Sequence, residues 1–265
     1  MHSLSSRPRA AACALVAAGV FVVLLVMVAA GWEPLHRADA RVAADLHTWV
    51  VGHPGWRRTL AFLTGWVWDP WDFRALAAVS AVLLWWQGRR RTAVWTAAVM
   101  IIGGLTGTLV KVAVARDRPM FTDPVADAPG WSFPSGHALN GMLGCVVLLA
   151  ALLPVVPRRV RPVLWIVAVV SVLGVGFTRM ALGVHFLSDV VAGWALGVVV
   201  AVVLWAAIAA LWDPAGTEPE DPSSAPSDDP EDGPEDGPAD DGEAQITRGG
   251  DAGLDTPRPT GRSSG

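Results

Sequence analysis

Long apolar stretches constrain what this chain can fold into more than any other feature of its sequence. An α-helix needs about 20 mostly apolar residues to cross the hydrocarbon core of a bilayer, and five stretches come close to that length. They occupy residues 10–31, 92–110, 138–156, 163–178 and 190–212.

A sixth apolar stretch, residues 74–87, is shorter than the others. We expect it to draw on the Trp-rich residues that precede it or to insert with local thinning of the bilayer. The chain has 265 residues, of which 52% are hydrophobic. The sequence therefore predicts an all-α integral membrane protein, built as a bundle of six transmembrane helices.

The first stretch, residues 10–31, has two interpretations. Arg7 and Arg9 precede it and small residues end it, as in a secretory signal. Its 22 residues exceed the usual apolar core of such a signal, which favours a span that is not cleaved. In both cases the residues that follow it face outward.

Arginines between the apolar stretches predict the orientation in the membrane. Residues 89–91 are all arginine, and three more arginines lie within residues 158–161. The positive-inside rule makes these two loops cytoplasmic, together with residues 1–9. Both termini of a six-span protein are then cytoplasmic, and we expect a multi-pass protein of the plasma membrane. The predicted outer loops are residues 32–73, 111–137 and 179–189.

The last segment, residues 213–265, differs in composition from the rest of the chain. It carries fifteen acidic residues and three arginines, so its formal charge is −12, whereas the remaining residues sum to +8. It is rich in Pro, Gly, Ser, Asp and Glu and holds almost no large apolar residues. We expect a disordered acidic tail, because such a segment cannot bury enough apolar surface to become ordered.

The first outer segment, residues 32–73, is predicted to contain a helix. Its apolar residues recur with helical spacing among charged ones. Such a helix either lies along the membrane surface or packs as an ordinary helix on the ends of the spans, and the pattern fits both. The recurring apolar residues are Leu35, Val42, Leu46 and Trp49.

Three clusters of polar residues all belong to the predicted outer side. Each has a simple explanation when taken alone: a lysine that reaches out of the membrane, a helix cap, or an interfacial histidine. Their meeting on one side of the membrane is what makes them candidates for a functional site. The candidate residues are Lys111, Arg118, Ser135, Gly136, His137, Arg179, His185 and Asp189.

His185 and Asp189 are four residues apart, so they share one face of a helix. A carboxylate there accepts the hydrogen of one imidazole nitrogen and leaves the other nitrogen unprotonated and more basic, as in a nucleophilic histidine. The helix that residues 135–137 open offers free N–H groups and a positive dipole end to an anion. Together with three cations, these groups meet the needs of phosphoryl transfer, and His137 is free to protonate the leaving oxygen.

We expect neither a metal nor a cofactor. Both cysteines, Cys13 and Cys145, lie inside apolar stretches, where a thiol behaves as a small hydrophobic group and forms no disulfide framework. The remaining histidines lack the spacing of metal ligands. The expected partners are the bilayer and a membrane lipid phosphate, and no nucleic acid is expected.

The spacing of these residues resembles the three signature motifs of the type 2 phosphatidic acid phosphatase superfamily, which are similar to those of vanadium-dependent haloperoxidases. The first motif runs from Lys111 to Arg118-Pro119, the second is Pro-Ser-Gly-His at 134–137, and the third runs from Arg179 through His185 to Asp189. The resemblance covers residues 92–212. One departure is Thr178, where the superfamily usually has serine, and threonine keeps the hydroxyl.

This resemblance implies a six-helix membrane domain at residues 10–212, with its motif core at 92–212 and its active site at the outer ends of the helices. It implies hydrolysis of a lipid phosphate without a metal, through a phosphohistidine on His185, with Asp189 as its partner and His137 as the acid. It also implies five phosphate ligands, namely Lys111, Arg118, Ser135, Gly136 and Arg179.

The sequence leaves several alternatives open. Phosphatidic acid, phosphatidylglycerol phosphate and polyprenyl diphosphates are all suitable substrates. A phosphotransferase that passes the phosphoryl group to an alcohol would use the same residues. A six-span transporter fits less well, because charges in transporters tend to lie near the bilayer midplane, and vanadate-dependent oxidation ranks lower because those relatives are soluble.

Overall fold

The computed structural model describes residues 6–212, and within that range the chain forms helices joined by loops, without strands. The prediction of an all-α fold is confirmed for these residues. The predicted acidic tail, residues 213–265, lies outside the described part. The helices are α1 (Ser6–Ala29), α2 (Glu33–Val51), α3 (Pro54–Phe62), the π-helical segment η1 (Leu63–Val67), α4 (Pro70–Trp86), α5 (Arg90–Val114), α6 (Gly136–Leu152), α7 (Arg161–Ala181) and α8 (Leu187–Trp212).

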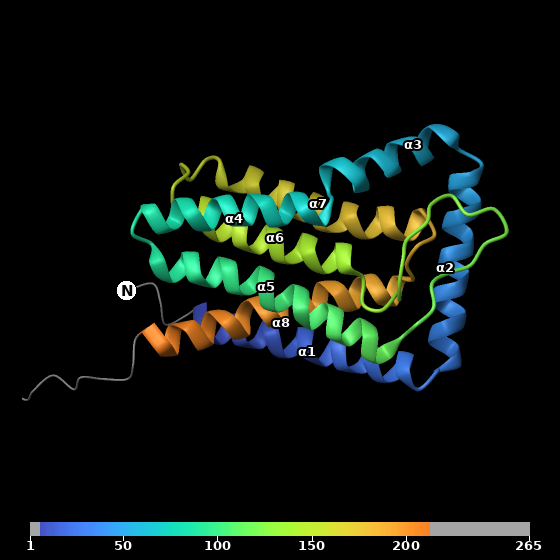
Figure 1. Ribbon diagram of the computed structural model, residues 1–265, viewed down its shortest axis with the longest axis horizontal. Coiled ribbons are helices and arrows are strands. Elements are labelled where there is room, and N and C mark those ends of the chain that lie inside the picture. Colours follow the sequence, from blue (N-terminus) through green and yellow to red (C-terminus); the bar gives the residue numbers. More distant parts are fainter. Residues whose placement is uncertain (1–5, 213–265) are drawn as a thin grey trace, which may run out of the picture. The chain divides into compact units, whose positions relative to one another are not determined.

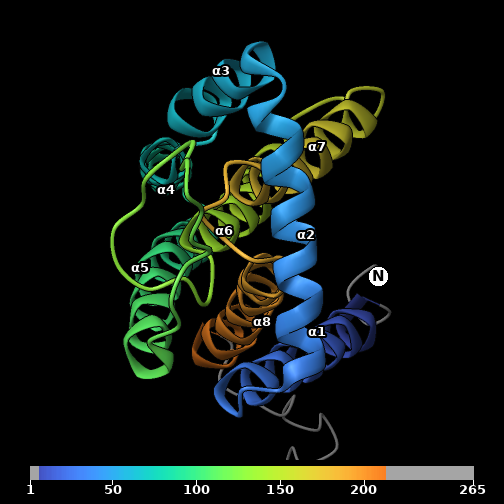
Figure 2. The same cartoon turned by 90° about the vertical axis from the view of Figure 1, so that its right-hand side faces the viewer.

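Helices α1, α4, α5, α6, α7 and α8 run along a common direction, and α2 crosses one end of them (Figures 1 and 2). Helix α6 packs against α4, α5, α7 and α8, and α1 packs against α8. Most residues of α6 are therefore buried or half-buried, although its composition is as apolar as that of a lipid-facing span. The second predicted polar cluster opens α6, so this packing surrounds the cluster with neighbouring helices at one end of the bundle.

Four helices, α1, α5, α7 and α8, are long and apolar enough to cross a membrane. Helices α4 and α6 have 17 residues each, which corresponds to about 26 Å at 1.5 Å per residue and is slightly less than the hydrocarbon thickness. By length and composition, four of the six predicted spans are thus supported. The shorter α6 begins further inside the bundle than the neighbouring ends of α5 and α7 (Figure 1).

The sides of the bundle expose large apolar side chains. Examples are Leu15, Leu109 and Ile166, with exposed fractions of 74%, 70% and 62%. Soluble proteins rarely expose apolar patches larger than a few hundred Å². This surface is that of a multi-pass membrane protein, in which lipid chains cover the outward-facing residues.

The two arginine-containing loops lie at the same end of the bundle, opposite α2 (Figure 1). The guanidinium of Arg89, in the turn between α4 and α5, donates hydrogen bonds of 3.4 and 3.3 Å to the carbonyl oxygens of Ala150 and Ala151 near the end of α6. The arginines of these two loops therefore gather at one end of the described bundle.

Helix α2 confirms the helix predicted within residues 32–73, but its most buried residues lie beside the apolar stripe that the spacing indicated. The predicted residues, such as Leu35 and Val42, are only half-buried, and the face turned inward includes polar side chains. Hydrogen bonds to loop residues, described below, explain the burial of these polar groups. The buried residues of α2 are Asp39, Ala43, His47 and Val50.

Candidate active site

One cavity, with a volume of about 420 Å³, brings together residues from all three predicted polar clusters. Six of the eight predicted site residues line it, together with residues of η1, of the start of α4 and of the loop 115–135. The lining residues are Thr64, Gly65, Asp69, Lys111, Arg118, Asp127, Ala128, Pro129, Gly136, His137, Arg179 and His185.

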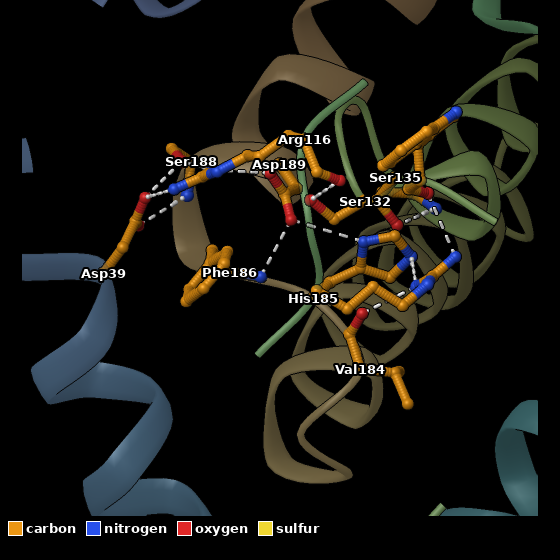
Figure 3. A network of polar contacts seen from close by, with 12 residues as sticks. Asp39, Arg116, Ser132, Ser135, Val184, His185, Phe186, Ser188 and Asp189 are labelled. Atoms are coloured by element: carbon orange, nitrogen blue, oxygen red, sulfur yellow. Dashed lines mark hydrogen bonds and ion pairs between the residues drawn. The ribbon is translucent and has the colours of Figure 1, made fainter. Parts of the chain in front are cut away.

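The imidazole of His185 is held from both sides. Nη1 of Arg118 donates to Nε2 of His185 at 3.2 Å, and because a guanidinium has only donors, Nε2 is the unprotonated nitrogen. Nδ1 then carries the proton and donates it to Oδ2 of Asp189 at 3.4 Å. Burial lowers the pKa of His185 to about 4, since desolvation disfavours the imidazolium. The ring, which Figure 3 shows beside Asp189, is therefore neutral near pH 7, with its lone pair on Nε2.

Asp189 and Ser135 lie behind the cavity wall, and both are fully buried. The hydroxyl of Ser135 accepts a hydrogen bond of 3.4 Å from the N–H of Ala138, which makes Ser135 the N-cap of α6. Its own N–H donates to the carbonyl oxygen of Asp189 at 2.9 Å. Ser135 was predicted to bind phosphate; in the structure its hydroxyl oxygen caps the helix that Gly136 and His137 open, and its O–H can still donate to an anion.

Backbone carbonyls of the loop 115–135 hold two of the predicted cations at the edge of the cavity. Nζ of Lys111 donates to the carbonyl oxygens of Trp131 at 2.6 Å and Ser132 at 3.4 Å. Arg118 donates through Nε and Nη2 to the same loop and through Nη1 to the segment before His185. Its carbonyl partners are Gly130 at 2.9 Å, Pro129 at 3.0 Å, Trp131 at 3.1 Å and Val184 at 2.6 Å.

Arg179, the third predicted cation, has spare hydrogen-bonding capacity. It is buried, and its Nη1 donates a hydrogen bond of 3.4 Å to the hydroxyl of Thr64. Its Nε is also buried and has no hydrogen-bond partner. Because a buried donor without a partner is costly, this nitrogen is suited to a ligand oxygen that enters the cavity.

Arg116 and Asp39, which were not predicted as site residues from the sequence, extend the site away from the cavity. Nη1 of Arg116 donates to Oδ1 of Asp189 at 2.6 Å, and Nη2 donates to Oδ2 of Asp39 at 2.8 Å. One signal was available, because Asp39 lies four residues after Leu35 and three before Val42, within the apolar spacing of α2. An acid at such a position requires a partner.

The donors that line the cavity suit an anion. Among residues 6–212, no group of three or more His, Cys, Asp or Glu side chains is arranged to hold a metal ion. The cavity offers instead two guanidinium groups and an ammonium, near the opening of α6. Its two acidic lining residues, Asp69 and Asp127, come from segments outside the three motifs.

Residues 92–213 match the family model described as PAP2 superfamily. Over 124 residues the chain is 32% identical to an undecaprenyl-diphosphatase of Sulfolobus acidocaldarius, a match that covers 45% of this chain and 56% of that protein. Over 98 residues it is 38% identical to phosphatidylglycerophosphatase B of Bacillus subtilis, covering 35% of this chain and 46% of that protein. The chain thus spans about half the length of the curated relatives it matches.

The fold is also similar to the crystal structure of a transmembrane PAP2 type phosphatidylglycerolphosphate phosphatase from Bacillus subtilis. The TM-score is 0.59 at 21% sequence identity, and the match covers 76% of this chain and 98% of that chain. At this identity the likeness shows the fold, which is that of a PAP2 transmembrane protein. The resemblance drawn from the motif spacing is confirmed.

Proposed function

Because residues 92–213 match the PAP2 superfamily model, we propose that this chain is an integral-membrane phosphatase that hydrolyses lipid phosphate monoesters or diphosphates. One observation carries the proposal: three cations and two histidines line a single cavity, with the unprotonated Nε2 of His185 beside Arg118. The two curated relatives, whose names specify an undecaprenyl diphosphate and a phosphatidylglycerophosphate, support substrates of this class, and phosphatidic acid belongs to it as well.

In the first step, Nε2 of His185 attacks the phosphorus while the bond from phosphorus to the leaving oxygen breaks. His137 donates a proton to that oxygen. Asp189 holds Nδ1–H and balances the positive charge that develops on the imidazole. In the second step, water attacks the phosphohistidine, the P–N bond breaks, and His137 takes up the proton of the water. No step in this scheme requires a metal ion.

Phosphate binding in this scheme relies on charge neutralisation by fixed groups. A phosphate oxygen takes the place of His185 Nε2 as a partner of Arg118, which frees the nucleophile at the moment the substrate is bound. Arg179 contributes its unpartnered Nε, and Lys111 acts as a point charge. Ser135 and Gly136 complete the proposed ligand set at the start of α6, where the hydroxyl of Ser135 and the N–H of Gly136 are donors for phosphate oxygens.

We further propose that α1, α4, α5, α6, α7 and α8 each cross the membrane. The arginine-rich loops then face the cytoplasm, together with both termini, and the cavity faces the extracytoplasmic side of the plasma membrane. A cavity at the outer ends of the spans suits a phosphate carried on a membrane-anchored tail. Helix α2 lies across the outer end (Figure 2).

A lipid phosphotransferase is the second candidate, since the same phosphohistidine can pass its phosphoryl group to an alcohol. A six-span transporter is less well supported, because the charges gather at one end of the bundle rather than near its middle. Both alternatives predict outcomes that differ from hydrolysis.

The decisive experiment measures phosphate release by the purified full chain in detergent, in the presence of EDTA. The panel contains phosphatidic acid, phosphatidylglycerol phosphate and a polyprenyl diphosphate, and the variants are H185A and H137A. Hydrolysis through His185 predicts release by the wild type that is lost in H185A. With the polyprenyl diphosphate, whose phosphate leaving group does not depend on a proton from His137, an acid-labile, alkali-stable phosphoprotein should accumulate in H137A, because the second step lacks its base.

The other outcomes separate the alternatives. Equal release by wild type and H185A would show that His185 is not the nucleophile. A new phosphate ester, formed only when an alcohol is added, would identify a phosphotransferase. If neither reaction occurs with any member of the panel, a transport function becomes the better explanation.

A further inference from the structure

We propose that Arg116 is a positioning residue that orients Asp189 toward His185, and that Asp39 of α2 is its second anchor. This inference rests on the proposed function, since it assigns a role within the proposed phosphatase site. It extends the site from the three motifs to a helix outside them.

The contacts of Asp189 show why its orientation depends on Arg116. Oδ1 accepts a hydrogen bond of 2.6 Å from Nη1 of Arg116, whereas Oδ2 accepts from the N–H of Phe186 at 2.9 Å and faces Nδ1 of His185. Each oxygen thus has its own donors, as Figure 3 shows. Turning the carboxylate would break a charge-assisted bond, so Arg116 determines which oxygen meets the histidine.

Arg116 is held just as firmly on its other side. Its Nη1 also donates to the hydroxyl of Ser188 at 2.8 Å, and its Nη2 donates to Asp39. Asp39 in turn accepts from the N–H of Ser188 at 3.0 Å and from its hydroxyl. The guanidinium lies 4.3 Å from the ring centroid of Phe186. Helix α2 and the start of α8 are therefore joined through one guanidinium.

Arg116 does not line the cavity, and its side chain is 7% exposed. It therefore cannot contact a phosphate in the way proposed for Lys111, Arg118 and Arg179. Its effect on the reaction has to pass through Asp189, which is the definition of a positioning residue. This separates its expected kinetic behaviour from that of the three cations in the cavity.

The charges around Arg116 predict an asymmetry between its two partners. Asp39 and Asp189 have exposed side-chain fractions of 2% and 0%, so one guanidinium forms ion pairs with two buried carboxylates. Removing Arg116 leaves both carboxylates without their cation, which is strongly destabilising for buried charges. Replacing Asp39 by asparagine leaves the pair of Arg116 and Asp189 intact. In R116K the lysine keeps the positive charge but lacks the planar guanidinium that reaches both carboxylates.

The first test is kinetic and uses R116Q, R116K and D39N in the full chain. We expect R116Q to lower kcat by about 10²-fold, the loss expected when a catalytic group is misplaced by about 1 Å, with KM little changed. R116K and D39N should lose less. The matched control is R89Q, which should keep kcat, because the guanidinium of Arg89 donates to the carbonyl oxygens of Ala150 and Ala151 at the opposite end of the bundle.

The second test does not depend on activity. In protein labelled with ¹⁵N-histidine, the His185 signals are identified by their loss in H185A. A hydrogen bond to a carboxylate deshields the Nδ1 proton, so the wild type and R89Q should show this proton far downfield. In R116Q it should move upfield or exchange too fast to be observed.

These readouts keep the inference and the proposed function distinguishable. If no lipid phosphate is hydrolysed, the proposed function fails, and the Nδ1 signal still decides the role of Arg116. An unchanged signal in R116Q, or a raised KM at normal kcat, would overturn the inference. If R116Q does not fold, R116K and D39N decide it: normal kcat and an unchanged Nδ1 signal in both would show that Arg116 only stabilises the fold.

Discussion

Arg118 donates a hydrogen bond of 3.2 Å to Nε2 of His185, the nitrogen opposite the one that faces Asp189. Arg118, which is proposed to bind phosphate, is thus hydrogen-bonded to the proposed nucleophile. This contact fixes the tautomer of the histidine before any ligand enters. It also means that the charge state of His185 is set by its surroundings and can be tested by pH.

The first prediction concerns the acid limb of the pH profile. Burial lowers the pKa of His185 to about 4, against an ordinary value of 6.5. Because only the neutral ring is a nucleophile, activity should persist as the pH falls below 6.5 and be lost as it falls through about 4. The measurement is kcat/KM against pH, which reports groups of the free enzyme.

A second variant checks this assignment. The positive charge of Arg118 contributes to the lowered pKa of His185. R118Q should therefore have low activity, and its acid limb should lie at higher pH than that of the wild type. An acid limb of the wild type close to 6.5 would contradict the prediction.

The second prediction concerns Lys111, the only lysine in the chain. Its ammonium lies 2.6 Å from the carbonyl oxygen of Trp131 and acts as a compact point charge at the cavity edge. In Lys111→Arg the side chain is longer and ends in a planar guanidinium, which cannot occupy the place of the lysine ammonium. We expect phosphate release to fall by about 10²-fold, with an unchanged elution volume in size-exclusion chromatography. Near-normal turnover would refute this account of Lys111.

The helices of the bundle could be predicted from the sequence because hydrophobic length and helical spacing are local properties. The apolar stretch 92–110, for example, lies wholly within α5, which extends further at both ends. The inward face of α2 could not be predicted in the same way. It is set by partners distant in sequence, such as Asp123, which accepts from His47 at 3.0 Å.

Prediction of the candidate site from the sequence was limited in the same way. The spacing of His185 and Asp189 predicted their contact, although His185 lies two residues before α8 begins and not on a face of that helix, as the sequence had suggested. The contact between Asp39 and Arg116 joins residues 77 positions apart, and no local pattern specifies such a pairing. The hydroxyl of Ser135 was ambiguous for another reason, because one group can cap a helix or bind an anion.

The third prediction uses the backbone of Ala115, which ends α5 with φ 48° and ψ 43°. A residue with a Cβ pays about 1–2 kcal/mol in this left-handed conformation, whereas glycine does not. Ala115→Gly should therefore raise the thermal unfolding midpoint in detergent, with a gain of about 1 kcal/mol. The control is Ala113→Gly inside the same helix, which should lower stability by a similar amount. Two changes of the same sign would contradict the role assigned to the left-handed backbone.

The fourth prediction concerns Gly193, where α8 crosses the start of α6. A Cβ at this position would lie 2.7 Å from the carbonyl oxygen of Ser135 and 3.2 Å from the N–H nitrogen of Leu139. Backbone atoms cannot turn aside, so Gly193→Ala should push α8 away from the helix opening that Gly136 forms, with a loss of about 1–3 kcal/mol of stability and of most activity. Gly19→Ala, whose Cβ would meet nothing within 4 Å, is the matched control. Equal unfolding midpoints and turnover for the two variants would show that this close approach is not needed to hold the site together.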